Sequence, residues 1–226
     1  MQALLLVGSL LLLAVAVPAA ILEIALTAGN PARAALVHGL QPAAGGEARL
    51  EASRALAVAF GDSSPAEVDL GLLALARARR LVASSTADAL PLFADAARHF
   101  ERGLARDPAQ PFAWALLAHV HLALGEPETA RRALALSYRT GPVSPSLVRV
   151  RAPLALLLAK PPDPSILPHL RRDLQALARR RDGWLVGWAR AAGLEEQLER
   201  LLDAPLAGSR PAQIARSRTA ERSGPR

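Results

Sequence analysis

The chain begins with a long segment that contains no charged side chain. Residues 3–22, ALLLVGSLLLLAVAVPAAIL, are mostly apolar, and the segment ends at Glu23. Twenty helical residues reach about 30 Å, which is the thickness of the hydrocarbon core of a bilayer. The pattern therefore predicts a transmembrane anchor within residues 1–28, with membrane lipid contacting residues 3–22. Gly29-Asn30-Pro31 is expected to end this helix.

A cleaved signal peptide is the alternative interpretation of this segment. Ala14-Val15-Ala16 provides small residues of the kind found at cleavage sites. No lysine or arginine precedes the apolar run, however, and the run is longer than the core of a usual signal peptide, so the anchor is favoured. Arg33 follows the run and agrees weakly with a cytoplasmic domain by the positive-inside rule.

After the anchor, the apolar residues recur with the period of helices. Residues 29–63 are predicted to be a linker with one short helix at 48–60. Ser64-Pro65-Ala66-Glu67 has the signature of a capping box and predicts a helix from 64 to about 83. Comparable start signals predict further helices at 91–105, 111–123, 127–140, from Ser144-Pro145, from Asp163-Pro164, at 184–192 and at 194–203.

The expected fold is all-α. Short connections predict antiparallel neighbouring helices, and no stretch alternates apolar and polar residues with the period of a strand. The helices group into hairpins at 64–160 and C-terminal helices at 161–203. Composition agrees, because 51% of the residues are hydrophobic and only 4% are aromatic. Alanine and leucine, which favour helices most, dominate the apolar content.

The charge of the chain comes from arginine. The net charge is +7, and Lys160 is the only lysine. Residues 204–226 carry five arginines against one acid, Glu221, and lack an apolar face, so this tail is predicted to be disordered. The absence of cysteine excludes disulfides, thiolate nucleophiles and cysteine-ligated zinc.

A spacing of 34 residues relates two of the predicted hairpins. The matched pairs combine small residues, large apolar residues and prolines that follow helices: Ala96 with Ala130, Phe100 with Leu134, Gly103 with Ser137 and Pro108 with Pro142. On the helix between them, one face carries Trp114, Leu117, Ala118 and His121. Ala118 and Ala130 are small enough to let two helices approach closely, and Trp114 is expected to fill the space toward the neighbouring unit.

These residues resemble the tetratricopeptide repeat at its defining positions. In a unit from Pro111 to Ser144, Trp114 takes the aromatic position, Leu117-Ala118 the leucine–small pair and His121 the tyrosine position. The second helix supplies a small, a bulky, a small and a closing residue, which are Ala130, Leu134, Ser137 and Pro142. The pattern departs from the family at Arg80, where the preceding unit should carry an aromatic residue, and at Pro164 and Pro168.

The resemblance implies a fragment of an α-solenoid that binds a protein partner in a groove. Such a groove is lined by first-helix residues that face away from the core. The candidate groove residues in this chain are Phe112, Ala115 and His119.

No pattern in the sequence points to catalysis. His119 and His121 are two residues apart, so on a helix they point about 200° apart and cannot hold one ion. The sequence contains no phosphate-binding glycine loop and no nucleophile with a base at a recognisable spacing. It therefore predicts no catalytic, metal or cofactor site, and a protein that is not an enzyme.

Two features near the C-terminus leave alternatives open. Trp184 and Trp188 share a helix face, which fits either packing on the preceding helix or contact with a membrane interface. Arg171-Arg172 and Arg179-Arg180-Arg181 form a basic face that is either solvated or attracted to anionic lipid. Nucleic acid is not an expected partner, because aromatic interleaving and a known binding module are missing.

The expected function is that of a membrane-anchored scaffold for protein–protein interaction. The chain resembles small bacterial envelope proteins that carry one N-terminal anchor and few tetratricopeptide repeats. This resemblance suggests exopolysaccharide assembly or export, or a cytochrome c maturation adaptor, with membrane or envelope proteins as partners. It also implies the bacterial inner membrane and a periplasmic domain, against the indication from Arg33. The alternative is a structural subunit of a larger membrane complex.

Overall fold

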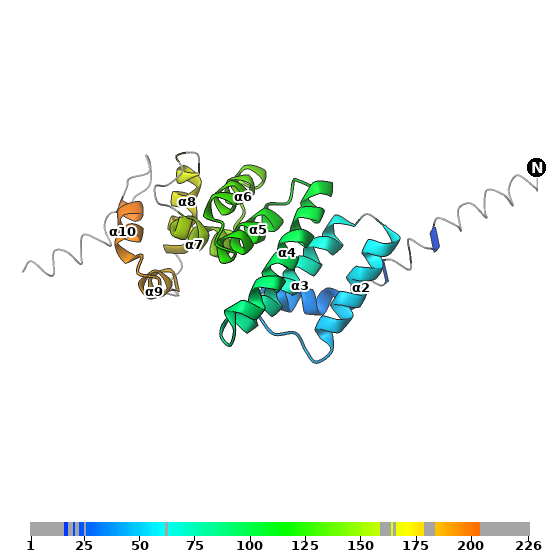
Figure 1. Cartoon of the computed structure of the whole chain (residues 1–226). Coiled ribbons are helices and arrows are strands. Elements are labelled where there is room, and N and C mark those ends of the chain that lie inside the picture. The colour runs from blue at the N-terminus through cyan, green and yellow to red at the C-terminus, as the bar shows by residue number, and fades with distance from the viewer. Residues whose placement is uncertain are drawn as a thin grey trace, which may run out of the picture.

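The computed structural model describes residues 16–17, 20, 23–24, 26–61, 63–158, 164, 166–178 and 184–203. Within these ranges all regular secondary structure is helical. Residues 26–37 form the first long helical stretch. The labelled helices that follow are α2 (Gly46–Phe60), α3 (Ser64–Val82), α4 (Thr86–Arg106), α5 (Pro111–Ala123), α6 (Pro127–Thr140), α7 (Val148–Leu158), α8 (Leu167–Ala178), α9 (Trp184–Ala191) and α10 (Glu195–Asp203) (Figure 1).

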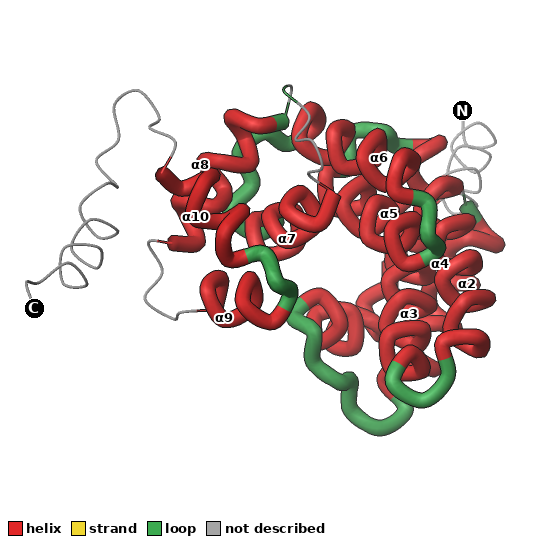
Figure 2. Tube along the Cα trace, turned by 60° about the vertical axis from the view of Figure 1, so that its left-hand side comes forward, coloured by secondary structure: helices red, strands yellow, loops and turns green. Residues whose placement is uncertain are grey.

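The helices follow one another across the molecule in chain order. Figure 1 shows α2 toward one end of the array and α10 toward the other, and Figure 2 shows the same order from a second direction. The closest packing joins α3 to α4 and α5 to α6, while α4 also packs on α5 and α7 on α8. One hydrophobic core extends from Ala32 to Leu201. For the described residues, the predicted all-α fold of helical hairpins is confirmed.

Helices α5 and α6 begin and end at the predicted residues. Pro111 and Pro127 occupy their first positions, where a missing N–H leaves no intrahelical hydrogen bond unmade. Gly125 lies in the turn between them with a φ of 78°, a conformation that glycine adopts without steric strain. The start and stop signals of this hairpin are local, which is why the sequence predicted them well.

The cap of α3 lies one residue earlier than predicted. The Ser63 hydroxyl oxygen accepts a hydrogen bond from the Ala66 N–H at 3.3 Å, so Ser63 is the capping residue. Ser64 is the first residue of the helix, and its hydroxyl donates to the Gly103 carbonyl of α4 at 2.7 Å. The serine predicted to cap α3 therefore joins two helices instead.

Helix α4 begins at Thr86, earlier than the predicted start at residue 91. The Ser85 hydroxyl accepts a hydrogen bond from the Asp88 N–H at 3.2 Å and caps the helix there. Pro91, which was expected to open the helix, lies inside it. The early start places the first turns of α4 beside the last turn of α3, and the pocket described below is formed at that place.

Residues 29–63, which were predicted to be a linker, belong to the packed domain. The helix over 26–37 continues through Gly29, Asn30 and Pro31 rather than ending there. Gly29 lies so close to α2 that a Cβ atom at this position would be 2.7 Å from the Ser53 hydroxyl oxygen. Leu50 of α2 is completely buried. The glycine therefore permits two helices to approach closely, which is a packing role and not a helix break.

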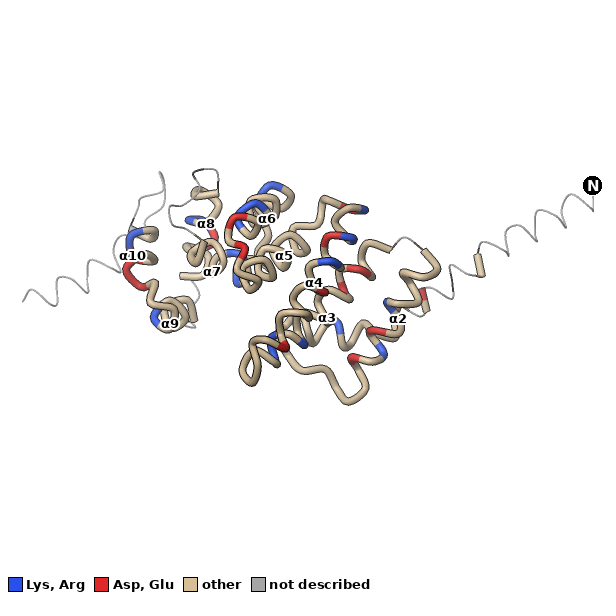
Figure 3. The backbone as a smooth tube through the Cα atoms, in the orientation of Figure 1, with Lys and Arg blue, Asp and Glu red and all other residues tan. Residues whose placement is uncertain are grey.

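A buried ion pair joins this helix pair to α3. Arg54 is 3% exposed, and its Nε donates to Asp69 Oδ2 at 2.8 Å. The Arg54 guanidinium also donates to the Leu26 carbonyl and to Asn30 Oδ1, both on the preceding helical stretch. Arg33 Nε donates to the other Asp69 oxygen at 2.6 Å. The N-terminal helices are thus fastened to the domain by charge as well as by apolar packing. Figure 3 shows how acidic and basic positions intersperse along α2, α3 and α4.

The prolines predicted to open the next two helices precede them instead. Residues 145–147 form a turn, and α7 begins at Val148. Pro164 also lies in a turn, and α8 begins at Leu167. Both prolines therefore lie in turns before a helix, and neither is itself helical.

A second buried cluster holds α6, α7 and α8 together. Arg151 is completely buried, donates to the Gly141 carbonyl at 2.6 Å and lies 4.4 Å from the centroid of the Tyr138 ring. Its Nη2 atom lies 3.4 Å from Asp173 Oδ2. Burial raises the pKa of both Asp173 and Tyr138. The helices after residue 148 therefore continue the array rather than forming a separate unit.

The two C-terminal tryptophans pack against the domain. Their ring centroids lie 6.5 Å apart, and both Trp184 and Trp188 contact the hydrophobic core. The Arg149 guanidinium lies 5.2 Å from the Trp184 ring centroid, a distance within the range of a cation–π interaction. The structure thus shows both tryptophans packed against the core, with Trp184 beside Arg149 of α7.

Among the described residues, no helix combines the length and the apolar content that crossing a bilayer requires. The span predicted at 3–22 lies outside those residues, except for positions 16, 17 and 20. The predicted disordered tail at 204–226 and Arg179-Arg180-Arg181 also lie outside them.

Candidate partner-binding site

The residues predicted to pack the repeat meet where α4, α5 and α6 cross. The buried members of the predicted set are Ala96, Phe100, Leu117, Ala118, His121, Ala130 and Leu134. Ser137 is also buried, and its hydroxyl donates to the Pro111 carbonyl at 2.7 Å, which joins α6 to the start of α5. The small residues leave room for two helices to approach, as the spacing predicted.

Trp114, Pro108 and Pro142 lie at the edge of this helix crossing. Trp114 is partly buried against the core, and its Nε1 donates to the Pro108 carbonyl at 2.8 Å. Pro108 and Pro142 are themselves exposed, which corrects their assignment to the packing set. They follow the ends of α4 and α6, where proline prevents a helix from continuing.

The preceding hairpin repeats this crossing with a spacing that the sequence analysis missed. A hydrogen bond joins the first residue of α3, Ser64, to Gly103 of α4, and another joins the first residue of α5, Pro111, to Ser137 of α6. The starts of α3 and α5 therefore correspond at a spacing of 47 residues. At that spacing Gly71 corresponds to Ala118, and a Cβ on Gly71 would lie only 2.7 Å from the Phe100 ring. The small residue of the first hairpin is therefore Gly71.

The apparent mismatch at Arg80 follows from the same change of spacing. Glu67, not Arg80, corresponds to Trp114, because α3 has 19 residues against 13 in α5 and α4 has 21 against 14 in α6. Glu67 is 2% exposed, and its carboxylate lies 2.7 Å from His99 Nδ1. The correspondence follows from the Ser64–Gly103 hydrogen bond, since aligning Pro65 with Pro111 gives a spacing of 46 residues instead.

The comparison with family models agrees with this geometry. Residues 92–147 match the tetratricopeptide repeat. The match includes most of α4, all of α5 and α6 and the turn before α7. Repeats of this family are typically protein-interaction modules without catalytic activity. No curated protein and no solved structure matches the chain.

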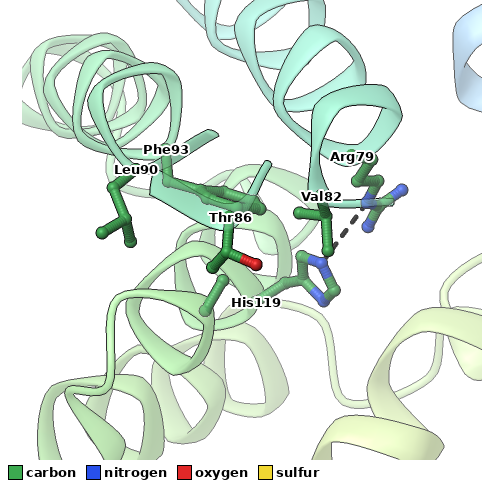
Figure 4. A pocket seen from close by; sticks show the side chains of 7 residues that line it. Arg79, Val82, Thr86, Leu90, Phe93 and His119 are labelled. Atoms are coloured by element: carbon green, nitrogen blue, oxygen red, sulfur yellow. Dashed lines mark hydrogen bonds between the residues drawn. The ribbon is translucent and has the colours of Figure 1, made fainter. Parts of the chain in front are cut away.

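A cavity of about 370 Å³ opens beside the matched repeat, between the end of α3, the start of α4 and α5 (Figure 4). Its lining is mostly apolar and consists of Arg79, Val82, Thr86, Leu90, Phe93, His119 and Ala123. Val82 and Leu90 are 44% and 42% exposed although both are large hydrophobic side chains. Of these residues only His119 was a predicted groove residue, and Thr86 and Leu90 precede the start of α4 that was predicted at residue 91.

A hydrogen bond between two basic side chains lies at the rim of the cavity. Arg79 Nε donates to His119 Nε2 at 3.3 Å, as the dashed line in Figure 4 marks. Burial and the charge of Arg79 lower the pKa of His119 to about 4, and burial lowers the pKa of Arg79 as well. His119 is therefore a neutral acceptor at neutral pH, and Arg79 supplies the positive charge of the rim.

The other predicted groove residues have different positions. Phe112 is partly exposed and packs against the core, whereas Ala115 is completely buried. Ala115 therefore does not face away from the core, which corrects that prediction. His119 contacts Arg79, while His121 Nδ1 lies 2.8 Å from Glu126 Oε2, so the two histidines point to different surroundings as the helical geometry predicted.

Protonation of His119 is expected to destabilise the domain in mild acid. The unfolded histidine binds a proton near pH 6.5, whereas His119 in the folded protein does so only at about 4. The free energy of unfolding therefore keeps its full value above pH 6.5, where His119 is neutral in both states. It decreases as the pH falls from 6.5 toward 4, because only the unfolded histidine then binds a proton. The loss reaches about 1–2 kcal/mol once the partial solvation of the ring is allowed for.

Urea unfolding at several pH values, followed by circular dichroism, measures this effect. The His119→Gln variant keeps an oxygen acceptor for Arg79 and should lose less stability than the native protein between pH 6.5 and 4. His38→Gln, at an exposed histidine, is the matched control. Identical pH profiles for the native protein and His119→Gln would contradict the prediction.

Proposed function

We propose that this chain is a membrane-anchored adaptor that binds a protein partner in the cavity between α3, α4 and α5. The composition of the cavity is the observation that supports the proposal. Exposed apolar side chains such as Val82 and Leu90 cost free energy in water, and a bound apolar side chain would remove them from it. The adjoining tetratricopeptide match supports a protein as the partner.

The charges around the cavity indicate an acidic partner segment. Arg77 pairs with Glu51 at 2.7 Å and Arg80 with Glu47 at 2.9 Å, so both of these arginines are neutralised by α2. Within the described part of the chain, Arg79 contacts His119 but no carboxylate. A partner with an apolar residue next to an aspartate or glutamate would fill the cavity and pair with Arg79.

Reversing the charge of Arg79 should weaken partner binding by about 30-fold or more, because a carboxylate at the rim would then meet a second carboxylate. The partner is first captured from native membranes by the full-length protein carrying a photo-crosslinking residue at Leu90. The affinity of the purified partner for the native protein and for Arg79→Glu is then measured in detergent.

Arg98→Glu is the matched control, because Arg98 is an exposed arginine of α4 that does not line the cavity. This variant should bind the partner as the native protein does. Equal affinities for Arg79→Glu and Arg98→Glu would contradict the proposed site. A partner that is lost with both variants would indicate general charge attraction and also contradict it.

The setting of the adaptor is proposed from the sequence. The uncharged run at 3–22 supports a single-pass anchor, and the resemblance to small bacterial envelope proteins supports the inner membrane, with a role in exopolysaccharide assembly or export. The domain is proposed to lie in the periplasm. Fusion of a reporter that is active on only one side of the membrane to the C-terminus tests the topology.

Purification in mild detergent distinguishes the adaptor hypothesis from the alternative that the chain is a structural subunit. A monodisperse protein that binds its partner reversibly supports the adaptor. A stoichiometric complex that resists salt would instead favour permanent assembly within a larger membrane complex, or a stable complex with apocytochrome if the setting is cytochrome c maturation.

A further inference from the structure

An arginine and a histidine lie side by side at the rim of the cavity. Arg79 is exposed and His119 is partly exposed, so a partner can reach both side chains. Arg79 Nε donates to His119 Nε2 at 3.3 Å (Figure 4). Because Nε2 accepts this hydrogen bond, the neutral ring carries its proton on Nδ1. Within the described part of the chain neither side chain forms an ion pair with an acid, so the rim has an uncompensated positive charge.

A second arginine–histidine contact in the same domain shows what such a pair can bind. Arg102 Nη2 lies 2.9 Å from His99 Nδ1. A carboxylate completes this group, because Glu67 Oε2 lies 2.7 Å from the same ring nitrogen and Glu67 Oε1 lies 3.3 Å from Arg102 Nε. The histidine and the arginine thus share one acid, which belongs to the neighbouring helix α3. The Arg79–His119 contact is comparable, but no acid of the described chain accompanies it.

The helices packed around α5 bring no acid to His119. Helix α3 contributes Arg79, and the cavity residues from α4 are the uncharged Thr86, Leu90 and Phe93. Arg79 is the charged group that acts on His119, and none from α6 or α7 does so among the described residues. Burial and this one charge keep the pKa of His119 at about 4 in the unbound domain. A carboxylate at the rim would raise that pKa, because an opposite charge favours the protonated ring.

We propose that Arg79 and His119 hold the partner's carboxylate jointly, and that His119 takes up a proton when the partner binds. This inference rests on the proposed function, which places an aspartate or glutamate of the partner at Arg79. On binding, His119 Nε2 gains a proton from the solvent and donates it in a hydrogen bond to the carboxylate, while the Arg79 guanidinium donates to the same acid. Partner binding therefore tightens as the pH falls from about 7 to about 5.5, a range in which an ordinary aspartate or glutamate stays ionised.

Two blocked dipeptides test this inference on the full-length protein in detergent micelles. Acetyl-leucyl-glutamyl amide supplies an apolar side chain and a carboxylate, and acetyl-leucyl-glutaminyl amide is the matched probe without the charge. Nuclear magnetic resonance gives the affinity of each probe at about pH 7 and about pH 5.5, and it follows the His119 ring directly. Because His119 should regain an ordinary histidine pKa in the complex, the glutamyl probe should bind about five- to tenfold tighter at the lower pH. In its presence the pKa of His119 should rise from about 4 toward about 6.5.

Two histidine variants provide the controls. His119→Gln, whose amide still donates to a carboxylate, should bind the glutamyl probe equally well at both pH values. His38→Gln, at an exposed histidine that does not line the cavity, should keep the native pH dependence. Circular dichroism at both pH values checks that each variant is folded.

The outcomes separate this inference from the proposed function. Equal affinities of the native protein at both pH values would overturn proton uptake and leave the binding site standing, and this result depends on no variant. The same pH dependence for the glutaminyl probe, or for His119→Gln, would also overturn it. Failure of the glutamyl probe to bind at either pH would instead contradict the cavity as the partner site, and with it the proposed function.

Discussion

Replacing Arg54 with methionine is expected to destabilise the domain by about 3 kcal/mol, because it leaves a buried carboxylate without its main partner. Asp69 is 4% exposed and would retain only Arg33, whose side chain is 45% exposed. The Leu26 carbonyl and the Asn30 side chain would lose the same donor. Urea unfolding of the full-length protein in mild detergent, followed by circular dichroism, gives the change in the free energy of unfolding.

A matched arginine on the same helix provides the control. Arg49 is exposed, and among the described residues it makes only a long hydrogen bond to the Ala44 carbonyl at 3.4 Å, so Arg49→Met should change stability by no more than about 0.5 kcal/mol. In the double variant Arg54→Met with Asp69→Leu, no buried charge remains unpaired. This variant should regain part of the lost stability. Equal losses for Arg54→Met and Arg49→Met would show that the buried pair does not fasten the N-terminal helices.

Local signals in the sequence predicted the helices well where one residue decides a helix end. Pro111, Pro127 and Gly125 act through their own backbone conformation, so α5 and α6 had the predicted bounds. Gly29-Asn30-Pro31 was misjudged because its effect depends on a neighbour. The glycine packs against α2 and the asparagine binds Arg54, and these contacts keep the segment helical in spite of its composition.

The repeat was recognisable from the sequence over the part of the second helices that the two hairpins share, although α4 has 21 residues and α6 has 14. The second helices α4 and α6 align at a spacing of 34, and their residues Ala96, Phe100, Ala130 and Leu134 are all completely buried. A fixed spacing failed for the first helices, because both α3 and α4 are longer than α5 and α6, and together they shift the correspondence to 47 residues. The cavity could not be predicted either, since it depends on three helix ends that meet only in the folded chain.

The crossing of α3 and α4 yields the second large expected effect. In the interior of an ordinary helix, replacing glycine with alanine stabilises the protein by about 1 kcal/mol. At Gly71 a Cβ would lie 2.7 and 2.8 Å from two atoms of the buried Phe100 ring, so the ring or the helix must move. Such overpacking outweighs the gain in helix propensity, and Gly71→Ala is expected to destabilise the domain by about 2 kcal/mol. Gly187→Ala is the matched control, since no described residue outside its own helix lies within 4 Å of its new Cβ, and it should be neutral or stabilising.

The second hairpin indicates which second substitution should relieve the overpacking in the Gly71→Ala variant. It has Ala118 and Leu134 where the first hairpin has Gly71 and Phe100, so a larger residue on one helix accompanies a smaller one on the other. Phe100→Leu alone should cost about 1–2 kcal/mol, because it leaves space beside the glycine. The double variant, which reproduces the alanine–leucine pair, should be more stable than the sum of the two losses by about 1 kcal/mol or more. Additive losses in urea unfolding would mean that the two hairpins cross differently, and the correspondence at 47 residues would then fail.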